Sequence, residues 1–454
     1  MAPVYGTPVS GTAIASVRGR RVWDSRGRPT VEAEVALAGG ARGRAIAPAG
    51  ASRGTHEAID LRDGGARLGG MDVAGAVANV NGAIARALAG MDARDQAAVD
   101  AALGALDGTP DRSRLGGNAT TAVSLAVLHA AAAGAGVPVY RQLMGPGPIR
   151  LPLPEIQIFG GGAHAGRRVD VQDFMVMPLG AASFAQALEM TAEVYRAAGE
   201  LMRDAGKLAG VADEGGWWPA FDANDEALDW LVRAIERAGF TPGDEVAISL
   251  DIAASELVVP GDPFHSPGSG RNVRYRLGLE GRELDSDAMG EMLERWLARY
   301  PIVSIEDPLA EDDGDGLARF TRAVGDRVQV IGDDFLVTNA ARVVAAAARG
   351  ACNAVLVKPN QAGTVTEARA ALDAGKRVQW GTIVSARSGE TEDVSIAHLA
   401  VGWDAGQLKV GSFARSERMA KWNEVLRIEE AEGANAHFAG RAALPQFRAG
   451  HGPT

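Results

Sequence analysis

The sequence contains little that would point to a secreted or membrane-spanning protein. Among 454 residues there is a single cysteine, Cys352, so no disulfide can form within the chain and a cytoplasmic setting fits best. The longest apolar stretch, Ala122 to Val137, is rich in Ala and Gly, contains His129 and is too short to cross a membrane. The start, MAPVYGTPVSGTA, lacks a basic segment followed by an apolar core, so we predict no signal peptide.

Excess positive charge is also missing. The net charge is −11 and the isoelectric point is near 5.3, which disfavours nucleic acid or an anionic membrane as the main partner. Apolar residues make up 46% of the chain and charged residues 23%, a composition typical of globular proteins. An anionic substrate would therefore need a local cationic pocket built against an acidic background.

Lysine is scarce as well. Of 46 basic residues only five are lysine: Lys207, Lys358, Lys376, Lys409 and Lys421. Lysine can lose its proton near neutral pH whereas arginine cannot, so a lysine kept in such an arginine-rich chain is a candidate for a chemical role. Chance survival on the surface is the alternative for any one of them.

The chain divides into two parts that differ in their predicted order of strands and helices. We predict tails at residues 1–13 and 441–454, an α+β domain over 14–145 and a second domain over 150–440. Residues 14–40 alternate as a β-meander, 72–145 read as mostly helical, and the four prolines within 143–154 indicate an irregular linker.

In the second part, short apolar runs each end in a polar residue. The markers are Asp251, Glu306, Asp333, Lys358, Arg387 and Lys409. From Glu306 onward they lie 22 to 29 residues apart, the length of a βα unit. The carboxyl ends of parallel barrel strands meet at one mouth, so this pattern predicts a (β/α) barrel with these groups together. Polar strand ends that merely face solvent would explain only one or two of them.

The marker residues have a coherent chemistry. Asp251, Glu306 and Asp333 offer hard oxygen ligands that suit Mg²⁺, although each alone could be a helix cap or salt-bridge partner. Lys358 follows close by, and neighbouring cations would lower its pKa toward that of a base working near pH 7. Arg387 offers a fork of donors suited to a phosphate.

Other candidates are individually weak. Ser388 could add a hydroxyl to a phosphate site, and Lys409 another positive charge. Glu214, on the Gly-flanked turn ADEGG, could act as a general acid. His164 lies in the Gly-rich segment FGGGAHAG, and Asp173 follows in VQDFM. A single His in a Gly-rich loop is more often structural than catalytic.

Together these strings resemble the enolase family, in the family's own order. They are DSRGRPTVEAEV, PAGASRG, GGAHA, QDFMVMP, DEGG, DIAASE, YPIVSIEDPLAEDD, GDDFLVTN, KPNQAGT, SARSGETED, GQLKVGS and RSERMAKWNEVLRIEE. The resemblance covers residues 14–430 and implies an α/β fold with an N-terminal α+β capping domain and a C-terminal TIM-type (β/α)8 barrel whose opening is modified. It also implies two Mg²⁺ ions and loss of water from 2-phosphoglycerate.

The resemblance assigns roles to residues of this chain. By it, Asp251, Glu306 and Asp333 would hold the first Mg²⁺, and Ser52 would join the second ion and the substrate phosphate. Lys358 would remove the proton α to the carboxylate, and Glu214 would protonate the departing hydroxide. Lys409 would bind the substrate carboxylate, whereas Arg387, Ser388 and His164 would lie on or near the phosphate.

The chain departs from the family pattern at the expected site. Ala386 replaces the histidine of SHRSGETED, Arg53 replaces the threonine of SGASTG, and Asp173 replaces the glutamate of QEFM. These changes favour a larger anion than 2-phosphoglycerate and place Arg53 and Asp173 among the expected substrate-binding residues. They resemble the requirement of carboxyphosphonoenolpyruvate synthases of phosphinothricin-type pathways, whose product carries an added carboxylate on phosphorus.

Two alternatives stay open at this point. One is an ordinary glycolytic enolase whose site has drifted, and the other is an enolase-fold protein that only binds. Whether the enzyme resembles a carboxyphosphonoenolpyruvate synthase or a glycolytic enolase, we expect its ligand to be a small phosphorylated or phosphonylated three-carbon acid. We also expect a homodimer or a larger homo-oligomer.

Overall fold

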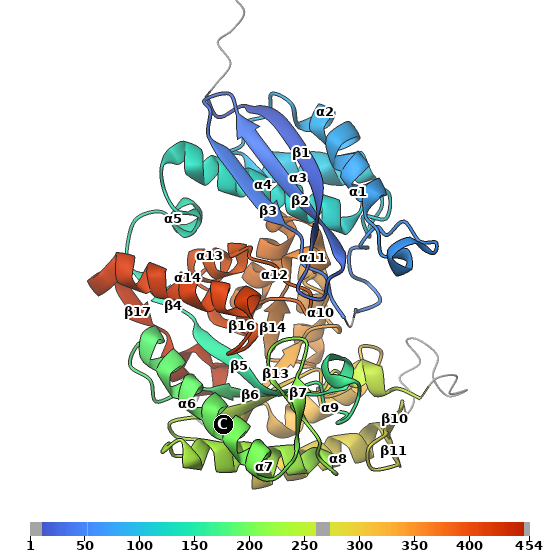
Figure 1. Ribbon diagram of the computed structural model, residues 1–454, viewed down its shortest axis with the longest axis vertical. Coiled ribbons are helices and arrows are strands. Elements are labelled where there is room, and N and C mark those ends of the chain that lie inside the picture. Colours follow the sequence, from blue (N-terminus) through green and yellow to red (C-terminus); the bar gives the residue numbers. More distant parts are fainter. Residues whose placement is uncertain (1–10, 52, 260–272, 449–454) are drawn as a thin grey trace, which may run out of the picture. The chain divides into compact units, whose positions relative to one another are not determined.

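The computed structural model describes residues 11–51, 53–259 and 273–448, and these form two compact units (Figure 1). The first unit comprises Met1–Ala49, Ala58–Pro146 and Pro359–Ala368. The second comprises Gly50–Glu57, Gly147–Lys358 and Arg369–Thr454. Ser52 lies outside the described residues, as do residues 1–10 and 449–454 of the two predicted tails.

The first unit is built on an antiparallel sheet with strand order β1 (Ile14–Trp23), β2 (Pro29–Leu37) and β3 (Arg42–Ile46). The predicted meander is therefore present, and it continues past residue 40 into β3. Helix α4 (Gly117–Ala135) packs on β2 and β3. Gly43 permits this close approach, because a Cβ there would lie 2.1 Å from the backbone nitrogen of Ala130.

The predicted helical block over 72–145 is also present in the first unit. It contains α1 (Ala74–Asn79), a π-helical turn (Val80–Ile84), α2 (Ala85–Leu88), α3 (Gln96–Asp107), α4 and α5 (Val139–Met144), after a short 3-10 turn (Arg67–Gly70). A segment distant in sequence completes the unit: α11 (Pro359–Ala362) and the first turn of α12 (Val365–Arg377).

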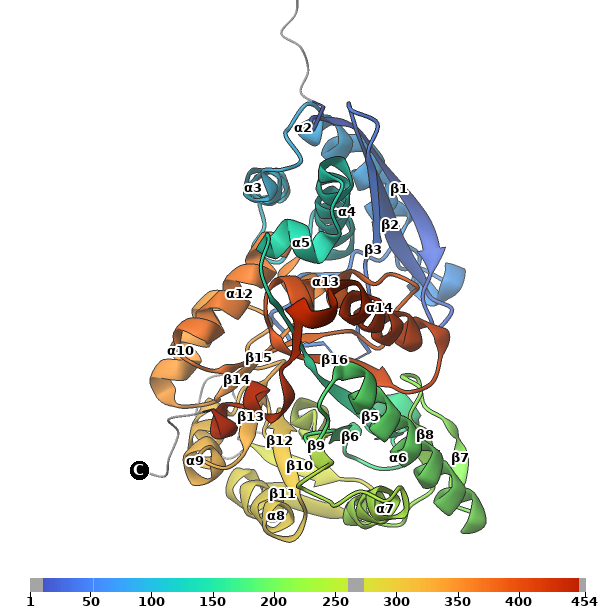
Figure 2. The same ribbon diagram turned by 90° about the vertical axis from the view of Figure 1, so that its left-hand side faces the viewer.

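The second unit contains the predicted closed barrel of eight strands, seen from the side in Figure 2. Around the barrel the order is β5, β6, β9, β12, β13, β14, β15 and β16, and β16 pairs with β5 to close it. The bounds are β5 Leu153–Gly160, β6 Asp173–Met177, β9 Ala247–Asp251, β12 Ile302–Glu306, β13 Gln329–Gly332, β14 Ala354–Val357, β15 Gly381–Ser385 and β16 Gly406–Ser412. All neighbours are parallel except that β6 runs antiparallel to both β5 and β9.

Helices and small hairpins complete the second unit. The helices are α6 (Phe184–Asp204), α7 (Asn224–Arg237), α8 (Ser286–Arg299), α9 (Gly314–Val324), α10 (Ala340–Arg349), the rest of α12, α13 (Ser395–Gly402) and α14 (Ser416–Glu432). Outside the barrel ring, β7 (Leu208–Val211) pairs with β8 (Trp217–Pro219), β10 (Arg274–Leu277) with β11 (Arg282–Asp285), and β4 (Ile149–Leu151) with β17 (Ala436–Phe438). Short 3-10 turns lie at Gly162–Ala165, Ala254–Leu257, Gly433–Asn435, Gly440–Ala443 and Pro445–Phe447.

Two expectations about irregular segments were wrong. Residues 143–154 contain β4 and the start of β5 rather than a structureless linker. Pro154 lies at the end of β5 that pairs with β16 alone, so its missing N–H costs no bond to β6. Residues 441–448 form two 3-10 turns, and Leu444 packs in a core cluster with Leu153 and Met177. That apolar contact holds the segment against the barrel.

Candidate active site

The carboxyl ends of the barrel strands carry the residues that the sequence singled out. Asp251 and Glu306 are the last residues of β9 and β12, and Asp333 and Lys358 directly follow β13 and β14. Arg387 lies two residues beyond β15, and Lys409 lies within β16. The chain thus places six groups, predicted from their spacing, around one mouth.

The reversed strand β6 brings in a seventh residue. Because β6 runs antiparallel, its first residue, Asp173, pairs with Asp251 at the carboxyl end of β9. A residue that starts a strand thereby reaches the same mouth as residues that end strands.

Lys409 lies among three buried carboxylates. Its Nζ is 2.9 Å from Asp251 Oδ2, 2.8 Å from Glu306 Oε2 and 3.7 Å from Asp173 Oδ2. Burial lowers the pKa of the Lys409 ammonium, but Asp251 and Glu306 outweigh this and hold that pKa well above its ordinary value. Lys409 is therefore a fixed cation at the centre of the mouth.

Lys358 forms an ion pair with Asp333. Burial lowers the pKa of Lys358, but the Asp333 carboxylate more than offsets it and the pKa is raised. The lowered pKa expected from neighbouring cations is thus not produced by the protein's own charges. The Asp333 loop is held by Asp307, whose carboxylate accepts the backbone N–H groups of Asp333 at 2.9 Å and Asp334 at 2.8 Å.

Glu214 lies on the turn between β7 and β8. The turn is fixed by hydrogen bonds from Tyr195 Oη to the Gly215 carbonyl, 2.8 Å, and from the Ser412 N–H to the Glu214 carbonyl, 2.9 Å. Glu214 Oε1 is 3.7 Å from His164 Nε2. Burial raises the pKa of Glu214, but the nearby His164 and cations leave it below its ordinary value.

Asp173 has the higher proton affinity of the two neighbouring carboxyls. Burial raises the pKa of Asp173 to about 6, His164 and Lys409 oppose the rise, and Glu214 adds to it. Ligand atoms of His164, Asp173 and Glu214 lie within 4.8 Å of one another. Two carboxyls and an imidazole this close form a unit that can hold or pass a proton.

Arg387 and Ser388 are tied to the segment Gly50–Glu57. Glu57 accepts two hydrogen bonds from the Arg387 guanidinium, at 2.8 and 3.1 Å, and both side chains are buried. Ser388 Oγ accepts the N–H of Ala51 at 3.3 Å. Arg53, in the same segment, is exposed.

A small cavity, about 20 Å³ in volume, collects most of these groups. Its lining includes Asp173, Glu214, Lys358, Ala386, Arg387 and Lys409. Ala386 therefore presents only a methyl group where the family pattern has an imidazole. Its N–H donates to the Lys409 carbonyl at 2.9 Å, so the backbone there is fixed by the sheet.

The donor chemistry of the mouth fits a hard divalent cation. Glu306 is fully buried, and its Oε1 has no hydrogen-bond partner among the described residues. Burial and then Asp251 raise the pKa of Glu306, so these carboxylates repel one another. A bound Mg²⁺ would accept the unused lone pairs of these oxygen atoms and would relieve the repulsion between the carboxylates.

The expected metal ligands are not drawn into one tight cluster. Within the described residues, the acidic cluster with oxygens inside 4.8 Å is Asp307, Asp333 and Asp334, rather than Asp251, Glu306 and Asp333. The reason is electrostatic: Asp251 and Glu306 share the ammonium of Lys409, whereas Asp333 is bound to Lys358.

Sequence reasoning missed several residues that shape the site. Gln157 bonds Asp173, Gln172 Nε2 donates to Asp251 Oδ2 at 3.1 Å, and Glu57 and Asp307 hold Arg387 and the Asp333 loop. Gln157 could have been noticed as a polar residue inside an otherwise apolar run, EIQIF. The others sit in polar segments and give no such signal.

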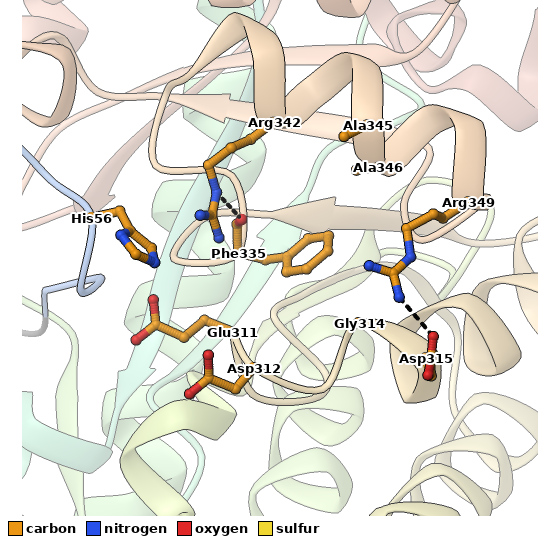
Figure 3. Close-up of a pocket in the computed structure, with 10 residues that line it drawn as sticks. All are labelled: His56, Glu311, Asp312, Gly314, Asp315, Phe335, Arg342, Ala345, Ala346 and Arg349. Carbon is orange, nitrogen blue, oxygen red and sulfur yellow. Dashed lines mark hydrogen bonds and ion pairs between the residues drawn. The ribbon is translucent and has the colours of Figure 1, made fainter. Parts of the chain in front are cut away.

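A second cavity in this unit, about 470 Å³, contains none of the predicted residues (Figure 3). It lies between the loop after β12, Phe335 and α10. Arg342 and Arg349 point into it from α10, the first donating Nε to the Phe335 carbonyl at 2.9 Å and the second pairing with Asp315 at 2.7 Å. The predicted site residues thus gather at the smaller cavity.

Comparison with known families agrees with this geometry. Residues 14–143 match the family model described as the enolase N-terminal domain, and residues 148–446 match the enolase C-terminal TIM barrel domain. In the described part of the chain, none of the helices combines the length and hydropathy needed to cross a bilayer. Since the two matches span nearly the whole chain, and the barrel carries carboxylates and lysines at its mouth, the chain belongs to the enolase family.

Proposed function

We propose that this protein is a Mg²⁺-dependent lyase that removes the proton α to a carboxylate and forms an enolpyruvate. The main observation behind this proposal is that Lys358, Glu214 and Lys409 line one small cavity. This cavity lies next to buried carboxylates at the ends of β9, β12 and β13. A base, an acid and fixed positive charge in a water-poor space are what abstraction of a weakly acidic proton needs.

Each residue has a part in this scheme. Lys358 Nζ, once unprotonated, takes the α-proton, and Glu214 delivers a proton to the hydroxide that leaves the neighbouring carbon. Asp173, whose pKa burial raises to about 6, is the nearby carboxyl that can replenish that proton. Lys409 and Arg387 hold the substrate's anionic groups.

Asp251, Glu306 and Asp333 would hold Mg²⁺, with Ser52, outside the described residues, joining a second ion. When bound, Mg²⁺ would supply positive charge beside the substrate carboxylate, where negative charge builds up as the α-proton leaves. The structure's own contribution is to keep these carboxylates buried and oriented, with Asp307 fixing the Asp333 loop through two backbone hydrogen bonds.

For the substrate we propose a carboxyphosphono-type compound, as in carboxyphosphonoenolpyruvate synthases. Two observations support this: Ala386 lines the cavity with a methyl group beside Arg387, and Arg53 adds an exposed cation to the segment that carries Glu57. An added carboxylate on phosphorus would need both space and a donor. The second candidate is 2-phosphoglycerate as in glycolytic enolase, favoured by the retention of Lys358, Lys409 and Arg387.

The lyase proposal is tested by hydrogen exchange at the α-carbon, followed by NMR in D₂O with saturating Mg²⁺. Lys358→Ala should lose exchange by several orders of magnitude, since the base is gone. Lys358→Arg should be nearly as damaging, because arginine does not give up its proton. Lys207→Arg, on the surface beside Asp222, is the matched control and should exchange normally. Exchange by Lys358→Ala at the wild-type rate would refute the base assignment.

The substrate proposal is tested by calorimetric titration with carboxyphosphono-enolpyruvate and phosphoenolpyruvate. A charge-assisted fork contact predicts a preference of about 10- to 100-fold for the first ligand. Arg53→Thr should remove most of that preference, and Ala386→His should weaken only the larger ligand by steric exclusion. Equal affinities in the wild type, together with fast turnover of 2-phosphoglycerate, would establish the glycolytic alternative instead.

A further inference from the structure

Gln157 is a fully buried polar side chain that the proposed chemistry does not use. It lies in β5, which pairs with β6 on one side and with β16 and β8 elsewhere along its length (Figure 2). Its amide has two partners: Nε2 donates to Asp173 Oδ1, and Oε1 accepts the N–H of Gly216 at 2.9 Å. One side chain therefore connects Asp173 to the turn that carries Glu214.

The orientation of this amide is fixed by chemistry. A backbone N–H only donates, so Oε1 must face Gly216, and this leaves Nε2 as the atom that faces Asp173. Flipping the amide would break both bonds. Gln157 is thus a spacer of defined length between the two elements.

Two glycines form the slot that holds the amide. A Cβ on Gly216 would lie 2.4 Å from Gln157 Oε1, and a Cβ on Gly160 would lie 3.4 Å from Gln157 Nε2. The main chain of Gln157 is held as well, because its carbonyl accepts Ser412 Oγ at 2.5 Å while the Ser412 N–H donates to Glu214. The spacer is therefore held both at its main chain and at its amide.

The length of the spacer matches the shortened acid. Asp173 is one methylene shorter than the glutamate of the family pattern, and Gln157 still reaches its carboxylate in a hydrogen bond. We propose that Gln157 is a positioning residue that sets the distance from Asp173 to the Glu214 turn, and that residues 157 and 173 function as a length-matched pair. This inference rests on the proposed lyase function.

The test shortens side chain 157 by one methylene and lengthens side chain 173 by one methylene, first separately and then together. Gln157→Asn should withdraw the amide from both partners, and Asp173→Glu should crowd it. Each single variant should lower kcat by about 10- to 100-fold, with KM changed less than about threefold, because misplacing proton-transfer groups mainly costs turnover. The double variant Gln157→Asn/Asp173→Glu restores the summed length of side chains 157 and 173, though not the bond to Gly216, and should recover part of kcat.

A second buried glutamine provides the control. Gln329 also lies inside the barrel, donates to Ser304 Oγ at 3.0 Å and Gln407 Oε1 at 2.9 Å, and is caged by a glycine, since a Cβ on Gly381 would lie 2.3 Å from its Oε1. Gln329→Asn should destabilise the barrel similarly but leave kcat near the wild-type value. An equal loss of kcat in Gln329→Asn would overturn the positioning role.

The outcomes separate the two proposals. Recovery of kcat in the double variant supports the pair, whereas a loss equal to the product of the single losses overturns it. If the wild type catalyses neither exchange nor elimination, the lyase proposal fails. In that case urea unfolding decides whether residues 157 and 173 form a length-matched pair. A shift of the urea midpoint in the double variant that differs from the sum of the two single shifts supports the pair, and a shift equal to that sum refutes it.

Discussion

At the scale of single residues, the few lysines occupy distinct places in the structure. Two of the five lysines, Lys358 and Lys409, line the small cavity. Lys421 is fully buried and structural, donating to the Thr391 carbonyl at 2.7 Å and pairing with Glu390 at 2.9 Å. Lys207 pairs with surface carboxylates. Composition thus directed attention to two cations that line the cavity, but only their contacts distinguish them from the structural Lys421.

Glu155 is a buried carboxyl outside the proposed chemistry. It lies in β5 opposite Lys409 of β16, its Oε2 accepts Ser249 Oγ at 3.3 Å, and its Oε1 has no hydrogen-bond partner among the described residues. Burial raises the pKa of Glu155 to about 7, with Lys409 opposing the rise. The folded protein therefore holds this proton more tightly than the unfolded chain does.

The raised pKa of Glu155 makes the free energy of unfolding depend on pH. Between the ordinary glutamate value near 4.5 and about 7, the folded state binds more protons, so the free energy of unfolding falls as pH rises through that window. In Glu155→Gln this loss should vanish. Urea unfolding in EDTA should show the variant gaining roughly 2–3 kcal/mol relative to wild type between pH 5 and pH 8. Parallel curves for the two proteins would mean that Glu155 titrates normally.

At the scale of elements, the strand ends could be predicted because each apolar run stopped at a polar residue on the mouth. Asp251, Glu306 and Lys358 were found this way. The reversal of β6 could not be predicted from the strand pattern, because the two faces of a fully buried strand give no sign of its direction. Partners such as Glu57 were also out of reach, since it meets Arg387 across more than 300 positions in sequence.

Two neighbouring helices of the barrel unit begin with aspartate caps in different surroundings. Asp285 is exposed and, within the part of the chain that the structure describes, its side chain accepts only the Ala288 N–H, at 2.9 Å, at the start of α8. Asp313 is buried at the start of α9, where it accepts the Gly316 N–H at 3.0 Å and, in addition, hydroxyls of Tyr275 and Ser286. The second carboxylate satisfies three donors rather than one.

We expect this difference to appear in stability. Asp285→Ala should cost about 1 kcal/mol, the ordinary value of an exposed cap. Asp313→Ala should cost about 3 kcal/mol, because two buried hydroxyls lose their acceptor as well. Urea unfolding of both variants measures the gap. Equal losses would show that the Tyr275 and Ser286 hydroxyls find other partners at little cost.

At the scale of the whole molecule, the chain passes between the two units several times. The segment Gly50–Glu57 leaves the first unit for the barrel unit, and Pro359–Ala368 leaves the barrel unit for the first. Helix α12 begins among residues of the first unit and ends among residues of the second. A continuous helix cannot unfold in one unit without fraying in the other, so we expect the two units to unfold together.

Asp100 provides a way to test this from within the first unit. Its buried carboxylate accepts Ser124 Oγ at 2.6 Å, Gln96 Nε2 at 3.0 Å, and the N–H and Oγ1 of Thr366 at 2.9 and 2.6 Å. The Thr366 bonds anchor the first turn of α12. Asp100→Ala removes the acceptor of Ser124 Oγ and of both Thr366 donors, whereas Gln96 keeps the Ser124 oxygens, and should cost about 2–3 kcal/mol.

The readout lies in the other unit. Seven of the eight tryptophans belong to the barrel unit: Trp217, Trp218, Trp230, Trp296, Trp380, Trp403 and Trp422. If unfolding is shared, the urea midpoint followed by tryptophan fluorescence should fall in Asp100→Ala by the same amount as the midpoint followed by far-ultraviolet circular dichroism. A fluorescence midpoint that stays at the wild-type value, with a second transition in circular dichroism, would show that the units unfold independently and that α12 can break at their junction.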